Sequence, residues 1–173
     1  MTRIRTLPAF VLALALTGPI LYAQEAPVGD ITAEGLIEAL TPRPQRVLRG
    51  VTTVLREEDM PSIDLSVEFE FGSFELTLDA QSLLTSLGQA ITSDALQPYR
   101  FRLAGHTDAV GSEDFNQELS MARAEAVRAF LVATVGIDME RLEATGLGET
   151  QVLFEETPDD PRNRRVEVRV LPN

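Results

Sequence analysis

Apolar and polar side chains alternate along residues 63–71. Every second position is apolar and the positions between are acidic or serine; the apolar set is Ile63, Leu65, Val67, Phe69 and Phe71. Successive side chains of a strand point to opposite faces of a sheet, so this period of two predicts a strand with one buried and one wet face. Shorter alternations over 99–103, 142–145 and 165–170 predict three more strands of the same kind.

Two stretches between these strands place their apolar residues three or four positions apart, as a helix does. The first covers residues 80–91, with Thr77 before it in the position of an N-cap. The second is expected within residues 114–134, and Gly136 suits its C-terminal cap. The order strand, helix, strand, helix, strand, strand, with half-polar strands, predicts an α+β fold whose mixed sheet carries helices on one face only. Both helical crossovers are expected to be right-handed parallel units.

The first 23 residues form a separate segment. Arg3 and Arg5 precede a short apolar run over 9–16, and the small residue Ala23 precedes polar ones. This order predicts a secretory signal peptide, residues 1–23. An uncleaved membrane anchor is the alternative, but the apolar run is shorter than the ~20 residues that a span needs. We therefore expect an exported mature chain with no direct membrane span.

Residues 24–62 are predicted to be a tether with one short helix. Four apolar residues there are spaced to form one side of that helix: Ile31, Leu36, Ile37 and Leu40. Prolines at positions 42 and 44 end it. The folded domain is then expected over residues 63–173, and residues 30–50 are a candidate contact for an envelope protein.

Charge narrows the classes of partner. The chain has 27 acidic residues against 15 basic ones, all arginine, and a formal net charge of −12. Binding to nucleic acid or to anionic lipid requires a basic face, so neither is expected as a partner. The chain contains no cysteine, which excludes disulfides, thiolate metal sites, a cysteine nucleophile and lipid attachment through cysteine.

Two residues of the segment 104–124 stand out chemically. Asp108 follows the end of a predicted strand, and Arg123 falls on the helix face that also carries Leu119 and Val127. A guanidinium on an apolar face is partly desolvated and needs an anionic partner. Either Asp108 and Arg123 form a structural salt bridge, or they are the poles of a ligand site. In the second case Asp108 accepts from an ammonium and Arg123 binds a carboxylate, which selects zwitterions.

Parity along the last strand sorts the arginines near its start. Arg164 shares parity with the valines of that strand, which predicts that it points to the helix-covered face at the mouth of the strand. Arg165 and Arg169 have the opposite parity and are expected to face solvent. Gly146–Gly148 is accompanied by no phosphate-loop lysine and is predicted to be a turn.

The single histidine, His106, raises the question of catalysis. No GxSxG motif and no second histidine accompany it, which argues against a hydrolase. Its spacing to Asp108 and Asp114 fits no zinc or calcium pattern. We therefore expect His106 to pack at the strand end of a protein that is not an enzyme and that needs no metal or cofactor.

Several short motifs are together similar to one known family. They are Gly105-His-Thr-Asp108, Gly111, Asn116, Leu119-Ser120, Ala122-Arg-Ala124, Gly146-Leu-Gly-Glu149 and Asn163-Arg-Arg-Val166. Over residues 63–171 the chain resembles the OmpA-like C-terminal domain, a peptidoglycan-binding module. The resemblance implies a βαβαβ-type sheet with helices on one face, and peptidoglycan as the partner.

The resemblance also implies a ligand site. In the family, the residues that match Asp108 and Arg123 hold the free zwitterionic end of meso-diaminopimelate in the wall peptide. The other positions that the family places near this ligand are Thr107, Asn116, Leu119 and Arg164. The implied localisation is the periplasm of a Gram-negative bacterium, in association with peptidoglycan and the outer membrane.

Two classes of function remain open. In the first, the domain is a non-catalytic binding module that anchors an exported protein to the cell wall. In the second, it is an envelope interaction or assembly module that keeps the fold without binding the wall.

Overall fold

The computed structural model describes residues 31–42, 57–70 and 73–172. Within them, four strands form a sheet in the order β1–β4–β2–β3. Their bounds are Ser62–Leu65 for β1, Arg100–His106 for β2, Leu142–Gly148 for β3 and Arg165–Leu171 for β4. β2 and β3 are parallel, whereas β4 runs antiparallel to its neighbours β1 and β2. The predicted signal peptide, residues 1–23, lies outside the described residues.

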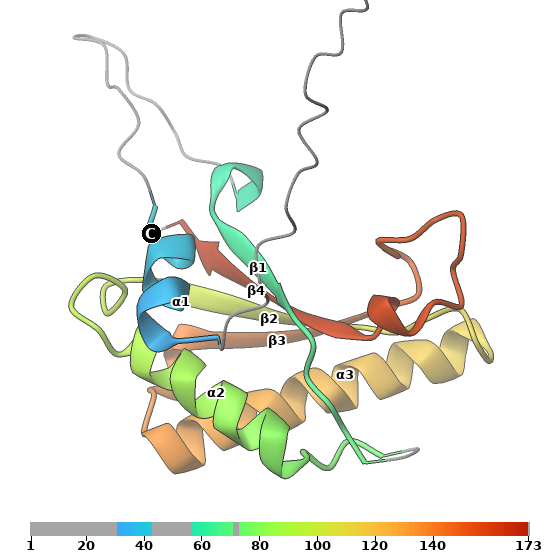
Figure 1. Cartoon of the computed structure of the whole chain (residues 1–173), viewed down its shortest axis with the longest axis horizontal. Helices are drawn as coiled ribbons and strands as arrows, with labels where there is room; N and C mark the ends of the chain where they lie inside the picture. The colour runs from blue at the N-terminus through green and yellow to red at the C-terminus, as the bar shows by residue number, and fades with distance from the viewer. Residues whose placement is uncertain (1–30, 43–56, 71–72, 173) are drawn as a thin grey trace, which may run out of the picture.

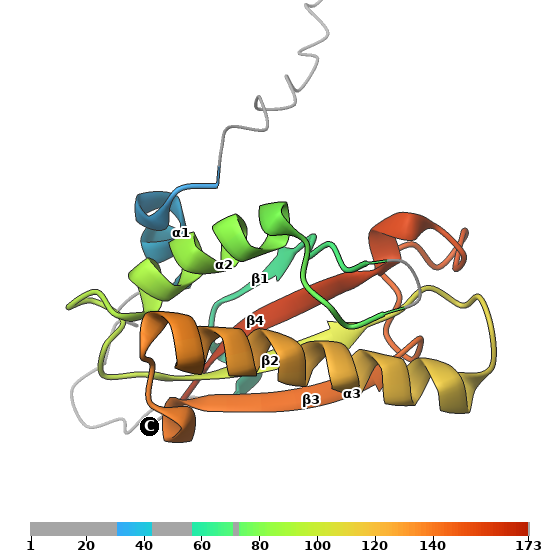
Figure 2. The same cartoon turned by 90° about the horizontal axis from the view of Figure 1, so that it is seen from below.

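Two long helices cover one face of this sheet (Figures 1 and 2). They are α2 (Leu78–Ile91) and α3 (Glu113–Phe130), and short 3-10 turns lie at Glu57–Asp59, Met139–Arg141 and Pro161–Asn163. Thr77 caps α2 by accepting a hydrogen bond from the backbone N–H of Ala80 at 3.2 Å. Gly136, with a φ of 79°, ends the π-helical turn Leu131–Val135 that continues α3. The predicted α+β class, mixed sheet and one-sided helical layer are confirmed.

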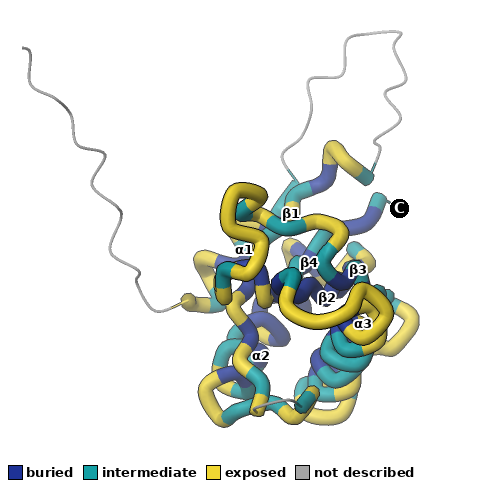
Figure 3. Tube along the Cα trace, turned by 90° about the vertical axis from the view of Figure 1, so that its right-hand side faces the viewer, coloured by how far each residue is buried: buried dark blue, intermediate teal, exposed yellow. Residues whose placement is uncertain are grey.

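The hydrophobic core lies between the sheet and these two helices (Figure 3). Strand residues of one parity fill it from the sheet side, and helical residues three or four positions apart meet them. Its fully buried members include Phe101, Leu103, Val168, Leu84, Leu87 and Val127. This packing fixes α3 against the strands that carry the site described below.

A short helix, α1 (Ala33–Leu40), forms within the predicted tether. Its apolar side packs against α2 and β1, where Leu36 and Leu40 are buried in the same core. The sequence pattern predicted the helix but did not predict that it packs onto the domain. No helix in the described ranges is long and apolar enough to cross a bilayer.

The first strand is shorter than the alternation predicted. β1 ends at Leu65, because the backbone N–H of Val67 turns back to donate to the Leu65 carbonyl at 3.0 Å and leaves the ladder. Val67 is nevertheless buried, and Phe69 packs against the core and forms an isolated bridge with Leu76. The alternation therefore marks an inward-facing side beyond the end of the strand.

Gly146–Gly148 is the end of β3, so the predicted turn is wrong. A Cβ on Gly146 would lie 2.5 Å from the backbone nitrogen of Met121, and one on Gly105 would lie 2.2 Å from the Ser120 carbonyl oxygen. Any side chain at these positions would push α3 away from the sheet. The glycines thus permit a close helix–sheet contact, which sets the height of α3 over β2 and β3.

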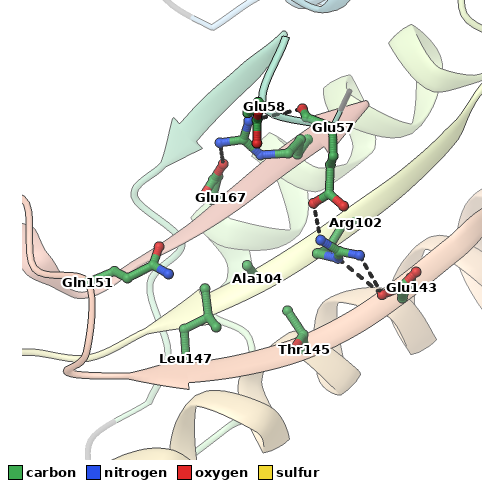
Figure 4. A pocket seen from close by; sticks show the side chains of 10 residues that line it. Glu57, Glu58, Arg102, Ala104, Glu143, Thr145, Leu147, Gln151 and Glu167 are labelled. Carbon is green, nitrogen blue, oxygen red and sulfur yellow. Dashed lines mark hydrogen bonds and ion pairs between the residues drawn. The ribbon is translucent and has the colours of Figure 1, made fainter. Parts of the chain in front are cut away.

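The opposite face of the sheet is polar, and none of the described α-helices covers it; we call it the open face (Figure 4). There Arg102 of β2 pairs with both Glu57 and Glu143, and Arg169 of β4 pairs with Glu167. These side chains line a hollow of about 590 Å³ over the strands. Arg102 and Arg169, the arginines that line this hollow, thus already have carboxylate partners.

Arg165 was expected to face solvent and does not. It has the parity of the open face, but it is only 7% exposed. Its guanidinium donates to Asp64 at 2.7 Å and to the carbonyls of Asn163 and Gln151 at 3.3 and 3.1 Å. Parity identified its face correctly, and the neighbouring strand and the β3–β4 loop cover that part of the face.

Candidate functional site

Thr107 and Asp108 directly follow β2, on a loop with fixed ends. The backbone N–H of Thr107 donates to the Gly148 carbonyl at the end of β3, and that of Ala109 donates to the Pro158 carbonyl, both at 2.9 Å. The loop after β2 is therefore held to β3 and to the β3–β4 loop. This places the Asp108 carboxylate beside the residues that precede β4.

Asn163 organises the β3–β4 loop from inside. It is fully buried, and its Oδ1 accepts the backbone N–H groups of Leu153 and Phe154 at 2.9 and 3.1 Å. Its Nδ2 donates to the carbonyls of Thr157 and Pro158 at 3.4 and 3.1 Å. One side chain thus closes the loop and fixes the position of Arg164, the next residue. The sequence analysis quoted Asn163 in a motif without giving it this role.

Asn116 performs the same task at the start of α3. Its buried Nδ2 lies 3.2 Å from the carbonyl oxygens of both Asp108 and Val110, and 2.5 Å from Oε2 of Glu149. The amide is occupied by the protein itself. Asn116 is therefore a positioning residue, which ties the Asp108 loop to α3.

All six residues that the family resemblance placed near a ligand line one pocket of about 400 Å³ at the end of β2. We call it the β2-end pocket. Its lining is Thr107, Asp108, Val110, Phe115, Asn116, Leu119, Arg123, Asp159 and Arg164. Val110, Phe115 and Asp159 were not among the predicted site residues. The pocket combines charges of both signs with apolar side chains.

The carboxylate of Asp108 pairs with Arg164. Oδ2 of Asp108 lies 2.6 Å from Nη1 of Arg164, and Oδ1 accepts the backbone N–H of Val110 at 3.3 Å. The Asp108 side chain is 10% exposed, whereas that of Arg164 is 48% exposed. A structural salt bridge between Asp108 and Arg123 was one of the two interpretations that the sequence left open. In the structure, Asp108 pairs with Arg164 instead.

Arg123 has no carboxylate partner among the described residues. Its Nε donates to the Ser73 carbonyl at 3.4 Å, and its guanidinium lies 4.9 Å from the centre of the Phe69 ring. Burial lowers the pKa of Arg123, nearby Arg164 lowers it further, and Asp108 acts in the opposite direction. Arginine nevertheless stays charged in proteins. The pocket therefore contains a half-buried cation with donors left for an anion.

The apolar and polar parts of the lining complement this cation. The side-chain oxygen of Thr107 is buried without a hydrogen-bond partner in the described part of the chain. Phe115 and Val110 are exposed at the mouth, at 55% and 62%, and Leu119 lines the wall. The arrangement suits a ligand with a carboxylate, a hydrogen-bonding group and an apolar stem.

His106 lies outside the β2-end pocket. Its ring is fully buried, with Nε2 3.7 Å from Oε2 of Glu167 on the open face, and neither ring nitrogen has a hydrogen-bond partner in the described ranges. His106, followed by Arg169, holds the pKa of Glu167 at about 2 against the opposing effect of burial. No cluster of three potential metal ligands occurs among the residues that the structure describes. His106 thus packs at the end of β2.

Comparison with known proteins identifies relatives of this domain. A profile of the OmpA family matches residues 68–165. The outer membrane porin F of Pseudomonas aeruginosa is 33% identical over 113 residues, which is 62% of this chain and 31% of that protein. The chain spans less than a third of the length of such curated relatives.

Solved structures share the fold. The peptidoglycan-associated lipoprotein of Burkholderia pseudomallei is 29% identical with a TM-score of 0.52, covering 61% of this chain and 88% of that one. A MotB-like protein of Desulfovibrio vulgaris is also 29% identical, with a TM-score of 0.58 over 69% of this chain and 77% of the other. The residues matched by the family profile, 68–165, include α2, β2, α3, β3 and every residue that lines the β2-end pocket.

Proposed function

Because the chain belongs to the OmpA family of non-catalytic, peptidoglycan-binding domains, we propose that its β2-end pocket binds the free zwitterionic end of meso-diaminopimelate in the wall peptide. The observation that supports this most is Arg123, a half-buried cation without a carboxylate partner in the described residues, in one pocket with Asp108. A structural arginine at such a depth would be expected to have its own anion. Here the ligand carboxylate supplies it.

Each side chain has a distinct role in this proposal. The Asp108 carboxylate accepts hydrogen bonds from the ligand ammonium, next to its contact with Arg164. Arg123 binds the ligand carboxylate with its planar fork. The free hydroxyl of Thr107 adds a hydrogen bond. Leu119 packs against the methylene stem, and Asn116 holds the loop in place without contacting the ligand.

Binding of this kind would anchor an exported protein to the cell wall. The relatives include outer membrane proteins and a peptidoglycan-associated lipoprotein. We accordingly propose a periplasmic location in a Gram-negative bacterium, with the chain at the peptidoglycan and near the outer membrane. A separate envelope partner for residues 30–50 remains a proposal, but Leu36 and Leu40 of that segment are buried within the domain itself.

Retention on purified sacculi that contain diaminopimelate tests the proposal. We expect the wild-type protein to be retained and Asp108→Ala to be released. Asp94→Ala, which changes an exposed acid beyond the end of α2, is the matched control and should be retained. Equal retention of Asp108→Ala and the control would contradict the site assignment.

Calorimetric titration tests the chemistry of recognition. Free meso-diaminopimelate presents an ammonium and a carboxylate on one carbon and should bind. Nα-acetyl-lysine amide presents an ammonium without a neighbouring carboxylate, and diaminopimelate diamide has both carboxylates neutralised, so both leave Arg123 unpaired and should bind poorly. Equal affinity for the three compounds would rule out recognition of a zwitterion, even if wall binding were observed.

A further inference from the structure

We infer that the β2-end pocket continues past Arg123 and Arg164 into a second compartment that takes another carboxylate of the same wall peptide. This inference rests on the proposed function. The second compartment has a volume of about 400 Å³. It is lined by Ser66, Val67, Glu68, Phe69, Arg123, Pro161, Arg162 and Arg164. We call it the Arg162 compartment.

The two hollows adjoin, because Arg123 and Arg164 line both of them. Arg123 lies on α3 with its guanidinium over the Phe69 ring, and Arg164 is the residue directly before β4. Their guanidiniums are close enough for Arg164 to lower the pKa of Arg123. A ligand that passes between these side chains therefore meets both compartments in turn.

The two compartments differ in charge. The β2-end pocket has two carboxylates, Asp108 and Asp159, against the two shared arginines, so its formal charges balance. That balance suits a zwitterion. The Arg162 compartment has three guanidiniums against a single carboxylate, that of Glu68.

The three guanidiniums of the Arg162 compartment differ in their carboxylate partners. Asp160 pairs with Arg162 and Asp108 pairs with Arg164, and neither acid lines the compartment, whereas Arg123 has no carboxylate partner among the described residues. The protein as a whole carries a formal net charge of −12. The unmatched guanidinium of Arg123, beside two further arginines, makes this hollow a site for an anion, because anions are repelled from most of the remaining surface of so acidic a chain.

Arg162 is held in place before any ligand arrives. Its Nε and Nη2 donate to the two oxygens of Asp160 at 3.1 and 2.8 Å, and its guanidinium stacks 3.8 Å from the centre of the Phe154 ring. Donation by Arg162 lowers the pKa of Asp160 to about 2. These contacts use Nε and Nη2 and leave Nη1 as a donor. An exposed arginine with two such contacts loses less side-chain freedom on binding than a free one.

The wall peptide supplies a carboxylate at the right place along its chain. The first amine of diaminopimelate is joined to the side-chain carboxyl of glutamate, whose α-carboxylate is then free. With the zwitterionic end in the β2-end pocket, the methylene stem and the amide of diaminopimelate lead out of that pocket to glutamate. The Arg162 compartment is the adjoining hollow lined by three arginines, and we assign it to this glutamate α-carboxylate.

Two synthetic tetrapeptides test the assignment. One is alanyl-γ-glutamyl-meso-diaminopimelyl-alanine with the wall stereochemistry, and the other replaces glutamate by isoglutamine, which converts only the α-carboxylate into an amide. The wild-type protein should bind the glutamate peptide about tenfold more tightly in calorimetry, as expected for one charge-assisted contact. Arg162→Ala should abolish this preference and leave the affinity for free meso-diaminopimelate unchanged.

Arg128→Ala is the matched control, because Arg128 pairs with Glu125 on α3 and lines neither compartment. It should keep the preference for glutamate. Equal binding of the two peptides by the wild-type protein, or an unchanged preference in Arg162→Ala, would overturn the inference while diaminopimelate binding stands. If the wild-type protein bound neither free meso-diaminopimelate nor either tetrapeptide, the proposed function would be overturned as well.

Discussion

Arginines on the two sides of the sheet have different partners. On the open face, Arg102 bonds to two glutamates (Figure 4). Arg169 bonds to Glu167, so each of these cations is matched within the protein. In the β2-end pocket, Asp108 is matched by Arg164, but Arg123 is matched only by a carbonyl and an aromatic ring. The comparison distinguishes charges that the fold pairs with carboxylates from one that the described part of the protein leaves without an anion.

Energetics supports this distinction. Partly exposed ion pairs contribute little to stability, so the open-face pairs can be lost at small cost. A half-buried guanidinium without an anion is unfavourable for the folded protein. Such a residue costs stability in the free protein and contributes to affinity in the complex. Four sets of variants test the comparison.

The largest effect is expected for Arg123→Ala. The variant should lose wall-peptide binding by about 2–5 kcal/mol, because the ligand carboxylate is then left unpaired in the pocket. Its melting temperature should be unchanged or higher, because an uncompensated charge has been removed. Titration with meso-diaminopimelate and thermal melting by circular dichroism measure the two effects. A large fall in melting temperature with binding preserved would make Arg123 a structural residue.

Asn163→Ala should have the next largest effect. It removes the acceptor for two backbone N–H groups and the donor to two carbonyls in the β3–β4 loop. We expect a loss of about 1–3 kcal/mol in the free energy of unfolding, because buried polar groups lose their partners. Urea titration measures it, with Gln97→Ala, an exposed change beyond α2, as control. A variant as stable as the control would show that the loop does not depend on this side chain.

A smaller effect is expected from pH. The pKa of Glu167 is held at about 2, below its usual 4.5, so its carboxylate stabilises the folded state at neutral pH. This contribution is complete above about pH 4.5 and is lost as the pH falls towards about 2. Between these two pH values, the melting temperature should therefore fall less steeply with decreasing pH for Glu167→Gln than for the wild type. The control is Glu118→Gln, on the exposed side of α3, which should show the same pH dependence as the wild type. If Glu167→Gln also showed the pH dependence of the wild type, the Glu167 carboxylate would not be stabilising.

The smallest effect is expected for Arg102→Ala. Its partners Glu57 and Glu143 are 40% and 43% exposed, so the loss in unfolding free energy should be at most ~1 kcal/mol. Binding of meso-diaminopimelate should not change. A binding defect in this variant would mean that the two faces are coupled, and that the contrast between them is too simple.

Much of the fold follows from local patterns in the sequence. Alternation identified the strands, Thr77 and Gly136 marked the helix ends, and the half-polar strands predicted a helical layer on one face. The length of β1 was wrong, because a backbone turn at Val67 depends on contacts that the alternation does not encode. Gly146 was taken for a turn residue, because its real constraint is the approach of a helix distant in sequence.

The site was predicted in two steps of different kind. Helix spacing and strand position identified Asp108 and Arg123 from physical chemistry, and strand parity placed Arg164 on the helix-covered face. The ligand role of Arg164, and the other three residues, came from the family resemblance. Local reasoning missed the pairing of Asp108 with Arg164 and the burial of Arg165, since both depend on how the β3–β4 loop folds back. Asn163, which the sequence analysis quoted in a family motif, was the available signal for that loop.

The closed β3–β4 loop also has a consequence for the course of binding. Ordering a loop costs about 1–2 kcal/mol per residue of conformational freedom, and here Asn163 imposes that order during folding. The ligand then meets a formed receptor, and association should be a single fast phase without a slow rearrangement. Under the proposed function, such a domain would exchange rapidly among neighbouring peptides and remain on the wall by repeated rebinding.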